Sequence, residues 1–190
     1  MAMSAENIHV GPGRIFLNVT NPATGTPPTW MPHTAGVPTP GTEIGYTEGD
    51  LILRKTKETF EVNPEQALGP VMTVVTREIV EVEFTALERV YDTLRAGFDN
   101  VGTVNDANRM AFYTGGAPFP LRTQSVFISS LRPNQAGKYE ITVIYRAYNV
   151  AGYEIAYRKG GASSYRMTLR GLFDTTRTIG DQLMQHYIEK

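Results

Sequence analysis

The chain has 190 residues and no cysteine, with 18 Lys and Arg against 19 Asp and Glu, so its formal net charge is −1. The lack of cysteine excludes disulfide scaffolds, thiol catalysis and zinc sites built on cysteine. The near-neutral charge disfavours a sequence-independent nucleic-acid binder, which needs a basic surface. No apolar run approaches the roughly 20 residues of a membrane helix, and the first residues lack the basic and apolar regions of a secretory signal. We therefore expect one soluble protein domain, made inside the cell and without a membrane span.

A proline-rich, uncharged segment is the first sign of organisation. Half of the 12 prolines lie between Pro22 and Pro40, and no Asp, Glu, Lys or Arg occurs from Ile15 to Thr42. Loops longer than about 15 residues are uncommon in compact domains, and they are usually functional or disordered. The segment also holds the only tryptophan of the chain. We predict a long loop over about 21–48 that docks on an adjacent subunit or ring, with a flexible surface loop as the alternative; the docking residues would be Thr29, Trp30, Met31, Pro32 and Val37.

Most of the remaining chain has the patterns of β-strands. The clearest strand is predicted over 71–85, where most even positions are apolar and most odd positions are polar, so that one face lies in the core. The apolar face would consist of Met72, Val74, Val80, Val82 and Phe84. Asn149 to Gly152 is predicted as a hairpin turn between two strands. The other strands are predicted at 7–10, 14–20, 50–62, 109–114, 123–130, 139–148, 153–158 and 164–173.

One helix is predicted over about 86–97. Thr85 and Glu88 have the spacing of a capping box, and Gly97 can end the helix. Apolar residues at Leu87, Val90, Tyr91 and Leu94 would form the stripe that packs on the sheet. We therefore expect a mainly β protein, a sandwich or barrel of antiparallel strands with one flanking helix and a long extended loop.

The last residues, 175–190, are predicted as a C-terminal arm separate from a domain over 1–174. Their apolar residues also fit a short amphipathic helix. These residues are Leu183, Met184, Tyr187 and Ile188.

A search for catalytic or ligand-binding motifs finds little. His9, His33 and His186 are not paired at metal-ligand spacing, and no phosphate loop, dinucleotide fingerprint or hydrolase elbow is present. Glu81 and Glu83 share one strand face and could serve carboxylate chemistry, although a solvated strand face is the more common reason for such a pair. We therefore predict that the protein is not an enzyme and has no catalytic residue, metal ligand or cofactor.

The order of several short segments resembles the tail tube, or major tail, proteins of long-tailed bacteriophages. No single segment is a strict signature, and the resemblance lies in their order and spacing over nearly the whole chain. The segments are Gly11-Pro12-Gly13-Arg14-Ile15-Phe16, Glu43 to Asp50, Glu58 to Val62, Gly69-Pro70-Val71, Glu81 to Thr85, Leu172-Phe173-Asp174 and Gly180-Asp181.

The resemblance implies a structural protein of the virion. Members of this family are β-sandwiches or barrels with one flanking helix, and they form rings, commonly hexameric, that stack around a lumen. Such a protein is assembled in the cytoplasm of the host bacterium on a tape-measure protein. The finished tube conducts double-stranded DNA into the host without binding it specifically, and it has no active site.

Two further hypotheses concern particular residues. The face with Glu81, Glu83 and Arg77 is a candidate wall of the lumen, because a negative surface repels DNA phosphates; the alternative is an outer or inter-subunit face. The two ends of the chain are candidate arms that reach across subunits, although termini are often simply mobile. Their residues would be Ile8 and Val10 at one end and Leu183 and Tyr187 at the other.

Two other classes of protein fit the same sequence. One is a monomeric β-barrel of the lipocalin kind, which would hold a ligand in an apolar cavity. The other is a different virion protein, such as a tail terminator or a decoration protein. Rings or tubes in an electron micrograph would separate the tail tube protein from a monomer.

Overall fold

The structure is a computed structural model, and it describes residues 13–28, 41–45, 47–62, 71–87, 94, 97, 102–105, 110–113, 122–132, 137–150, 152, 154–157, 159 and 163–189. This part of the chain is mainly β, and every strand pair in it is antiparallel. The strands are β1 (Arg14–Leu17), β2 (Thr42–Glu43), β3 (Thr47–Val62), β4 (Met72–Ala86), β5 (Gly102–Asn105), β6 (Met110–Tyr113), β7 (Gln124–Leu131), β8 (Tyr139–Asn149), β9 (Glu154–Ala156), β10 (Ser164–Gly171) and β11 (Met184–Ile188).

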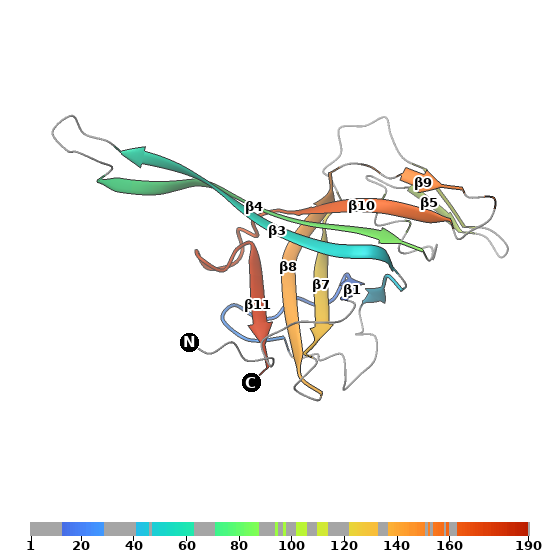
Figure 1. Cartoon of the computed structure of the whole chain (residues 1–190), viewed down its shortest axis with the longest axis horizontal. Coiled ribbons are helices and arrows are strands. Elements are labelled where there is room, and N and C mark those ends of the chain that lie inside the picture. Colours follow the sequence, from blue (N-terminus) through green and yellow to red (C-terminus); the bar gives the residue numbers. More distant parts are fainter. Residues whose placement is uncertain are drawn as a thin grey trace.

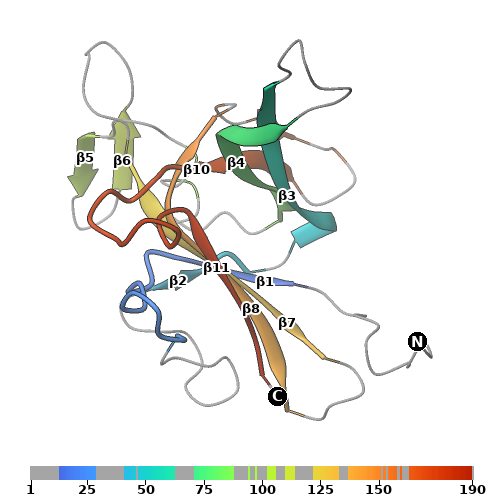
Figure 2. The same ribbon diagram turned by 90° about the vertical axis from the view of Figure 1, so that its left-hand side faces the viewer.

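Nine of the described strands form one sheet, and β5 and β6 form a separate pair. The main path of the sheet is β2-β1-β7-β8-β10-β4-β3. It divides at β8, because β11 and β10 pair in succession with the same strand. β11 pairs with residues 140–144 of β8, whereas β10 pairs with Ala147–Asn149. As a result β10, β4 and β3 lie across the end of β1, β7, β8 and β11 (Figure 1 and Figure 2).

The larger hydrophobic core lies between these two parts of the sheet. It joins Ile15, Val126 and Ile144 of one part to Val82 and Leu169 of the other. A second cluster, with Phe16, Phe127 and Tyr145 among its members, lies on the opposite face of β1, β7 and β8. Strands with both faces buried are apolar at successive positions, which explains the runs Ile15-Phe16-Leu17 and Val126-Phe127-Ile128.

The predicted antiparallel, mainly β class is confirmed, but the described sheet is open and ends at β2 and β3. The helix prediction is wrong at its start, since Ala86 is buried at the end of β4 and pairs with Tyr165. Ala86 lies on the same buried face of β4 as Val82 and Phe84. The packing of this face outweighs the local helix-capping signal at Thr85. Leu94 and Gly97 have helical backbone, and the rest of that segment lies outside the described residues.

The predicted hairpin at Asn149 to Gly152 is also wrong. β8 and β9 both pair antiparallel with β10, so they run in the same direction along one edge. The chain leaves β10 after Asn149 and returns to it at Glu154. The buried side chain of Asn149 donates hydrogen bonds to the carbonyl of Gly97, at 2.7 Å, and to the carbonyl of Gly152. Gly152 has a φ of 69°, a conformation that favours glycine.

The C-terminal segment forms a strand instead of the predicted amphipathic helix. β11 pairs with β8 from Met184 to Ile188, with Tyr187 opposite Ile141. Leu183 lies in the larger core of its own chain. Among the described residues after 174, β11 therefore belongs to the main sheet, and turns and bends over 175–183 precede it.

The predicted loop over 21–48 is shortened at its far end by β2, by the buried side chain of Ile44 and by the start of β3 at Thr47. The predicted docking residues lie outside the described residues, and so do Ile8 and Val10 of the predicted N-terminal arm. The docking residues are Thr29, Trp30, Met31, Pro32 and Val37.

Candidate functional site

A long β-hairpin that projects from the body is the most distinctive surface of the molecule (Figure 1). β3 and β4 pair from Thr47 opposite Ala86 to Val62 opposite Met72, with register irregularities between Glu48 and Ile52 and between Glu58 and Thr59. The part of β4 from Val80 onward alternates buried and partly buried side chains, whereas residues 72–77 are exposed. We call the exposed outer part, Thr56–Val62 with Val71–Ile79, the arm.

A β-bulge in the arm changes which side chains share a face. Glu58 pairs with Arg77, but Thr59 pairs with Val75, so that Thr76 is an extra residue in β4. The Thr76 hydroxyl donates a hydrogen bond to the Glu58 carbonyl at 3.1 Å. The bulge shifts the alternation of β4 by one position, and the prediction of a single apolar core face over 71–85 is therefore wrong in its outer half.

Beyond the bulge, one face of the arm carries two exposed apolar pairs across the strands. Phe60 lies opposite Val74, and Val62 lies opposite Met72. Their exposed fractions are 61% for Phe60, 58% for Met72, 40% for Val62 and 38% for Val74. We call these four residues the tip face. A contiguous group of exposed large apolar side chains is typical of surfaces that contact another protein, a membrane or a ligand.

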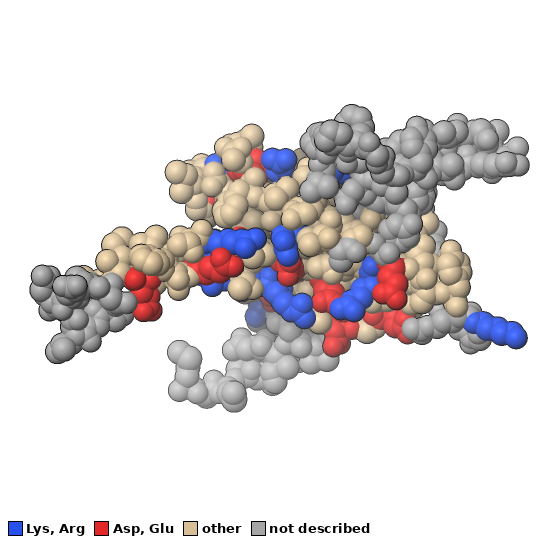
Figure 3. All heavy atoms as spheres, turned by 90° about the horizontal axis from the view of Figure 1, so that it is seen from above, with Lys and Arg blue, Asp and Glu red and all other residues tan. Residues whose placement is uncertain are grey.

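The same face of β4 carries charged side chains nearer the body. Glu83 pairs with Arg54 at 3.1 Å and also with Arg166, and Glu81 accepts a hydrogen bond from Arg170 at 2.8 Å. Acidic and basic side chains are therefore mixed on this side of the molecule (Figure 3). We call these five residues the charge ladder.

The charge ladder pairs both of its carboxylates with arginines. Hydrogen bonding from Arg166, with a smaller contribution from Arg54, lowers the pKa of Glu83 despite partial desolvation. Arg77 lies farther out on the same face, 3.5 Å from Glu58. The structure thus brings Glu81, Glu83 and Arg77 onto one face, as predicted, but it surrounds the two carboxylates with three arginines.

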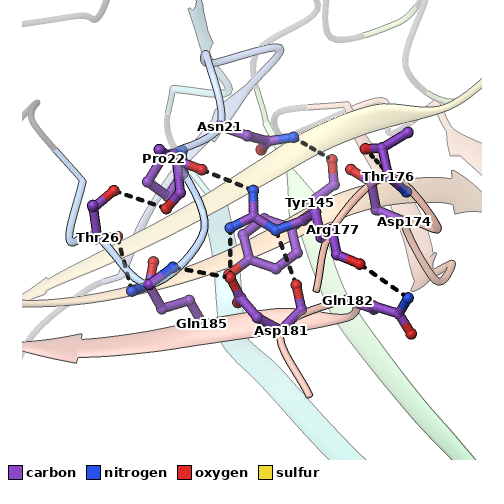
Figure 4. Close-up of polar contacts among 12 residues, drawn as sticks. Asn21, Pro22, Thr26, Tyr145, Asp174, Thr176, Arg177, Asp181, Gln182 and Gln185 are labelled. Carbon is purple, nitrogen blue, oxygen red and sulfur yellow. Dashed lines mark hydrogen bonds and ion pairs between the residues drawn. The ribbon is translucent and has the colours of Figure 1, made fainter. Parts of the chain in front are cut away.

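A third feature joins the C-terminal segment to the start of the proline-rich segment (Figure 4). The Arg177 guanidinium stacks on the Tyr145 ring, with its central carbon 3.6 Å from the ring centre. It donates hydrogen bonds to the Pro22 carbonyl at 2.8 Å, and to the backbone and carboxylate oxygens of Asp181 at 2.9 and 2.8 Å. The Tyr145 hydroxyl donates to the other Asp181 oxygen. We call Tyr145, Arg177 and Asp181 the Arg177 cluster.

The charges of the Arg177 cluster are stabilised by this geometry. Burial opposes ionisation of Asp181, but hydrogen bonds from Tyr145 and Arg177 outweigh it and lower the pKa of that carboxyl. Burial, together with the hydrogen bond to Asp181, raises the pKa of Tyr145, so its hydroxyl stays a donor. The Gly25 amide also donates to Asp181, at 3.3 Å.

Sequence reasoning missed this cluster. Arg177 and Asp181 lie four residues apart, which is the spacing of an ion pair on a helix. The segment between them forms turns and bends instead of a helix. Tyr145 lies far upstream on β8, and its pairing with them depends on the fold alone.

An open groove of about 710 Å³ lies where the base of β3 faces β7, β8 and β11. On the side of β11, His186 contacts Glu140 through Nε2 at 2.8 Å and Thr142 through Nδ1 at 2.9 Å. Apolar side chains from β3 and β7 complete much of the wall. The lining residues are Gly13, Thr47, Gly49, Asp50, Leu51, Ile52, Leu53, Ile128, Ser130, Glu140, Thr142 and His186.

The described residues include no group of three or more His, Cys, Asp or Glu side chains placed to hold a metal ion. Within the same residues, no helix is long and apolar enough to cross a membrane. Comparison of the chain with models of protein families gave no match, and comparison with curated proteins gave none either.

Proposed function

We propose that this chain is a structural subunit of a bacteriophage tail tube, which self-assembles into stacked rings and conducts DNA during ejection. The arm carries the proposal, because a hairpin with an exposed apolar face suits contact with another subunit. The order of sequence segments that resembles tail tube proteins supplies the identity of the assembly. In this proposal the rings are hexameric β-sandwich or barrel assemblies, formed on a tape-measure protein in the host cytoplasm.

The edges of the sheet support the proposal independently of the arm. β3 has 16 residues, and among the described strands it pairs with β4 alone. A long unpaired edge is a template for a strand from another chain, and closure of a ring removes such edges. We propose that one edge of each subunit pairs with the next subunit around the ring.

The charge ladder suits the wall of a DNA conduit. Its three arginines would attract phosphates if they were free, and Glu81 and Glu83 offset two of their three positive charges. Double replacement Glu81→Gln/Glu83→Gln should therefore make assembled particles retain double-stranded DNA at low salt, and retention should fall steeply as salt rises. Co-sedimentation of particles with labelled DNA measures this effect.

The control for this prediction is Glu78→Gln, which frees Lys55 and Lys57 on the opposite face of the same strands. Exposed ion pairs contribute only about 0–1 kcal/mol each, so both variants should fold. Equal DNA retention by the control, or no retention by the double variant, would contradict the assignment of the charge ladder to the lumen.

Negative-stain imaging and size-exclusion chromatography of the purified chain test the proposed function directly. Rings or tubes are expected, in equilibrium with subunits of 21.0 kDa. A monomer at every concentration would oppose the proposal and favour the lipocalin-like alternative. Rings that never stack would favour a tail terminator.

A further inference from the structure

We infer that the start of the proline-rich segment and the turns before β11 form one unit, which opens and closes as a whole while the sheet stays folded. The first part of this unit is residues 21–28, which we call the root. The second part is residues 173–182, which we call the strap. Such a movement belongs to the single subunit, so the inference goes beyond the proposed function.

Root and strap are bonded to each other through backbone groups of the root. The Pro22 carbonyl accepts a hydrogen bond from Arg177 at 2.8 Å (Figure 4), and the Gly25 amide donates one to Asp181 at 3.3 Å. The side chains of Arg177 and Asp181 also bond to each other, at 2.8 Å. Each contact of the strap with the root therefore depends on the other, and loss of one side chain weakens both.

A turn in the root presents these backbone groups. The Thr26 amide and hydroxyl both donate to the Ala23 carbonyl, at 3.0 and 2.7 Å. Gly25 lies within this turn and has a φ of 71°, a conformation that favours glycine. Strain at Gly25 would therefore disturb the turn and, with it, the contact of the root with the strap.

Few apolar contacts hold the unit closed. The strap places no apolar side chain in either of the two cores of the described residues, and its Ile179 is 90% exposed. In the root, residues 23–27 are exposed, while Pro22 and Pro28 are buried. Segments that bury few apolar side chains open at a lower free energy than core strands. Root and strap should therefore open before the sheet unfolds.

Fixed points on either side confine the opening to root and strap. The strap lies between Leu172, whose amide donates to the Arg146 carbonyl at 2.7 Å, and Leu183, which is buried in the larger core. Before the root, Val19 belongs to the second cluster, and its carbonyl accepts a hydrogen bond from Ser125 at 2.5 Å. The sheet can therefore keep its pairing when root and strap open.

The unit links two parts of the surface that are far apart in the sequence. The Thr26 carbonyl accepts a hydrogen bond from Gln185 of β11 at 3.0 Å, so the root also contacts the strand that follows the strap. Coupling between two sites is reciprocal. A partner that binds the closed root would therefore stabilise the strap, and a partner that binds the closed strap would stabilise the root.

Hydrogen exchange of dilute subunits, followed by mass spectrometry, tests the coupling with two glycine variants. Gly25→Ala strains the root, and Gly152→Ala, between β8 and β9, is the matched control. Gly152 has a nearly equal φ of 69°, and an added methyl group would meet open space at both positions. Gly25→Ala should speed exchange of root amides about tenfold, because a side chain is strained at such a φ.

The strap amides carry the decisive readout. In Gly25→Ala they should speed up by the same factor as the root, whereas Gly152→Ala should leave them unchanged, because opening of the unit does not release the strain at Gly152. A strap that responds equally to both variants would open only by global unfolding, and a strap that responds to neither would open separately from the root. Either result would overturn the inference. The strap amides with backbone partners are those of Asp174, Arg177 and Asp181.

A second pair of variants tests the coupling from the strap. Asp181→Asn removes the carboxylate that pairs with Arg177, and exchange in the root should rise about tenfold, as expected for loss of a charged hydrogen bond. Asp174→Asn is the control, since it removes a carboxylate from the same strap but keeps an oxygen that can accept from Thr176. An unchanged root in Asp181→Asn would show that the strap does not hold it. Because dilute subunits are measured, no outcome depends on whether the chain forms tubes.

Discussion

Replacement of residues 57–78 by Asn-Gly should give a folded subunit that no longer assembles. Thr56 and Ile79 pair directly across the strands, so a two-residue turn can join them. Asn-Gly suits the turn that matches the twist of antiparallel strands. Electron microscopy should show no rings or tubes at concentrations where the wild-type chain forms them.

The subunit should survive this deletion because the arm contributes nothing to either core. The buried side chains of β4 begin at Val80, and among the described residues that are removed, 57–62 and 71–77 are exposed and Glu78 is partly buried. Circular dichroism should show a strand spectrum and a cooperative thermal transition. Loss of that transition would mean that the arm is needed for folding, and normal tubes would refute its role in assembly.

Matched surface variants test whether assembly depends on the apolar side chains of the tip face or only on the length of the arm. Phe60→Ser/Met72→Ser removes apolar surface from the tip face, and Glu61→Ser/Thr73→Ser changes the cross-strand pair on the opposite face. The first pair should prevent assembly almost as fully as the deletion, whereas the second should leave tubes intact.

Arg177→Ala should lower the free energy of unfolding by about 2–3 kcal/mol. The substitution removes the stacking on Tyr145 and three hydrogen-bonded contacts, and it leaves the partly buried Asp181 without its cation. Because Asp181 keeps some contact with water, the effect should be smaller than for a fully buried pair. For a chain of this size the midpoint should fall by about 5–10 °C, measured by calorimetry or circular dichroism.

The pH dependence gives this prediction a second readout. The pKa of Asp181 is lower in the folded protein, so its contribution to stability is complete above the ordinary aspartate pKa of about 4 and is lost as pH falls through the folded value. Arg177→Ala should therefore reduce the loss of stability that occurs as the pH falls below about 4, which we call the acid limb of the stability curve. Arg177→Lys keeps the charge but loses the planar fork, and it should retain the acid limb with part of the stability. An unchanged limb in Arg177→Ala would contradict the assigned pairing.

Alternation in the sequence predicted the central strands well, because the pattern directly reflects burial on one or both faces. β7, β8 and β10 lie within a few residues of their predicted ranges. β11 was missed because Leu183, Met184, Tyr187 and Ile188 satisfy helical spacing as well as they fit a strand. The free edge of β8 decides between the two, and that edge exists only in the folded sheet.

The candidate site was less predictable, for a physical reason. An apolar strand face has the same sequence pattern whether its own core or another subunit covers it, so Met72 and Val74 looked like core residues. The extra residue at Thr76 moves them to the other face, and the only trace of it in the sequence is a lapse of the alternation at Thr76 and Glu78, after which apolar even positions resume at Val80. The arginines beside Glu81 and Glu83 come from β3 and β10, and only the register of three strands brings them together.

The division of the sheet at β8 has a mechanical consequence. A pull on the arm passes along β4 into β10, and β10 is bonded to β8 through only three residue pairs, Leu169–Gly171 with Ala147–Asn149. The two halves of the subunit are thus joined by a narrow seam of backbone bonds and a compact layer of side chains. Under load the seam would act as the compliant joint of the subunit, so that the proposed tail tube would bend at these seams rather than within the β-ladder of β3 and β4.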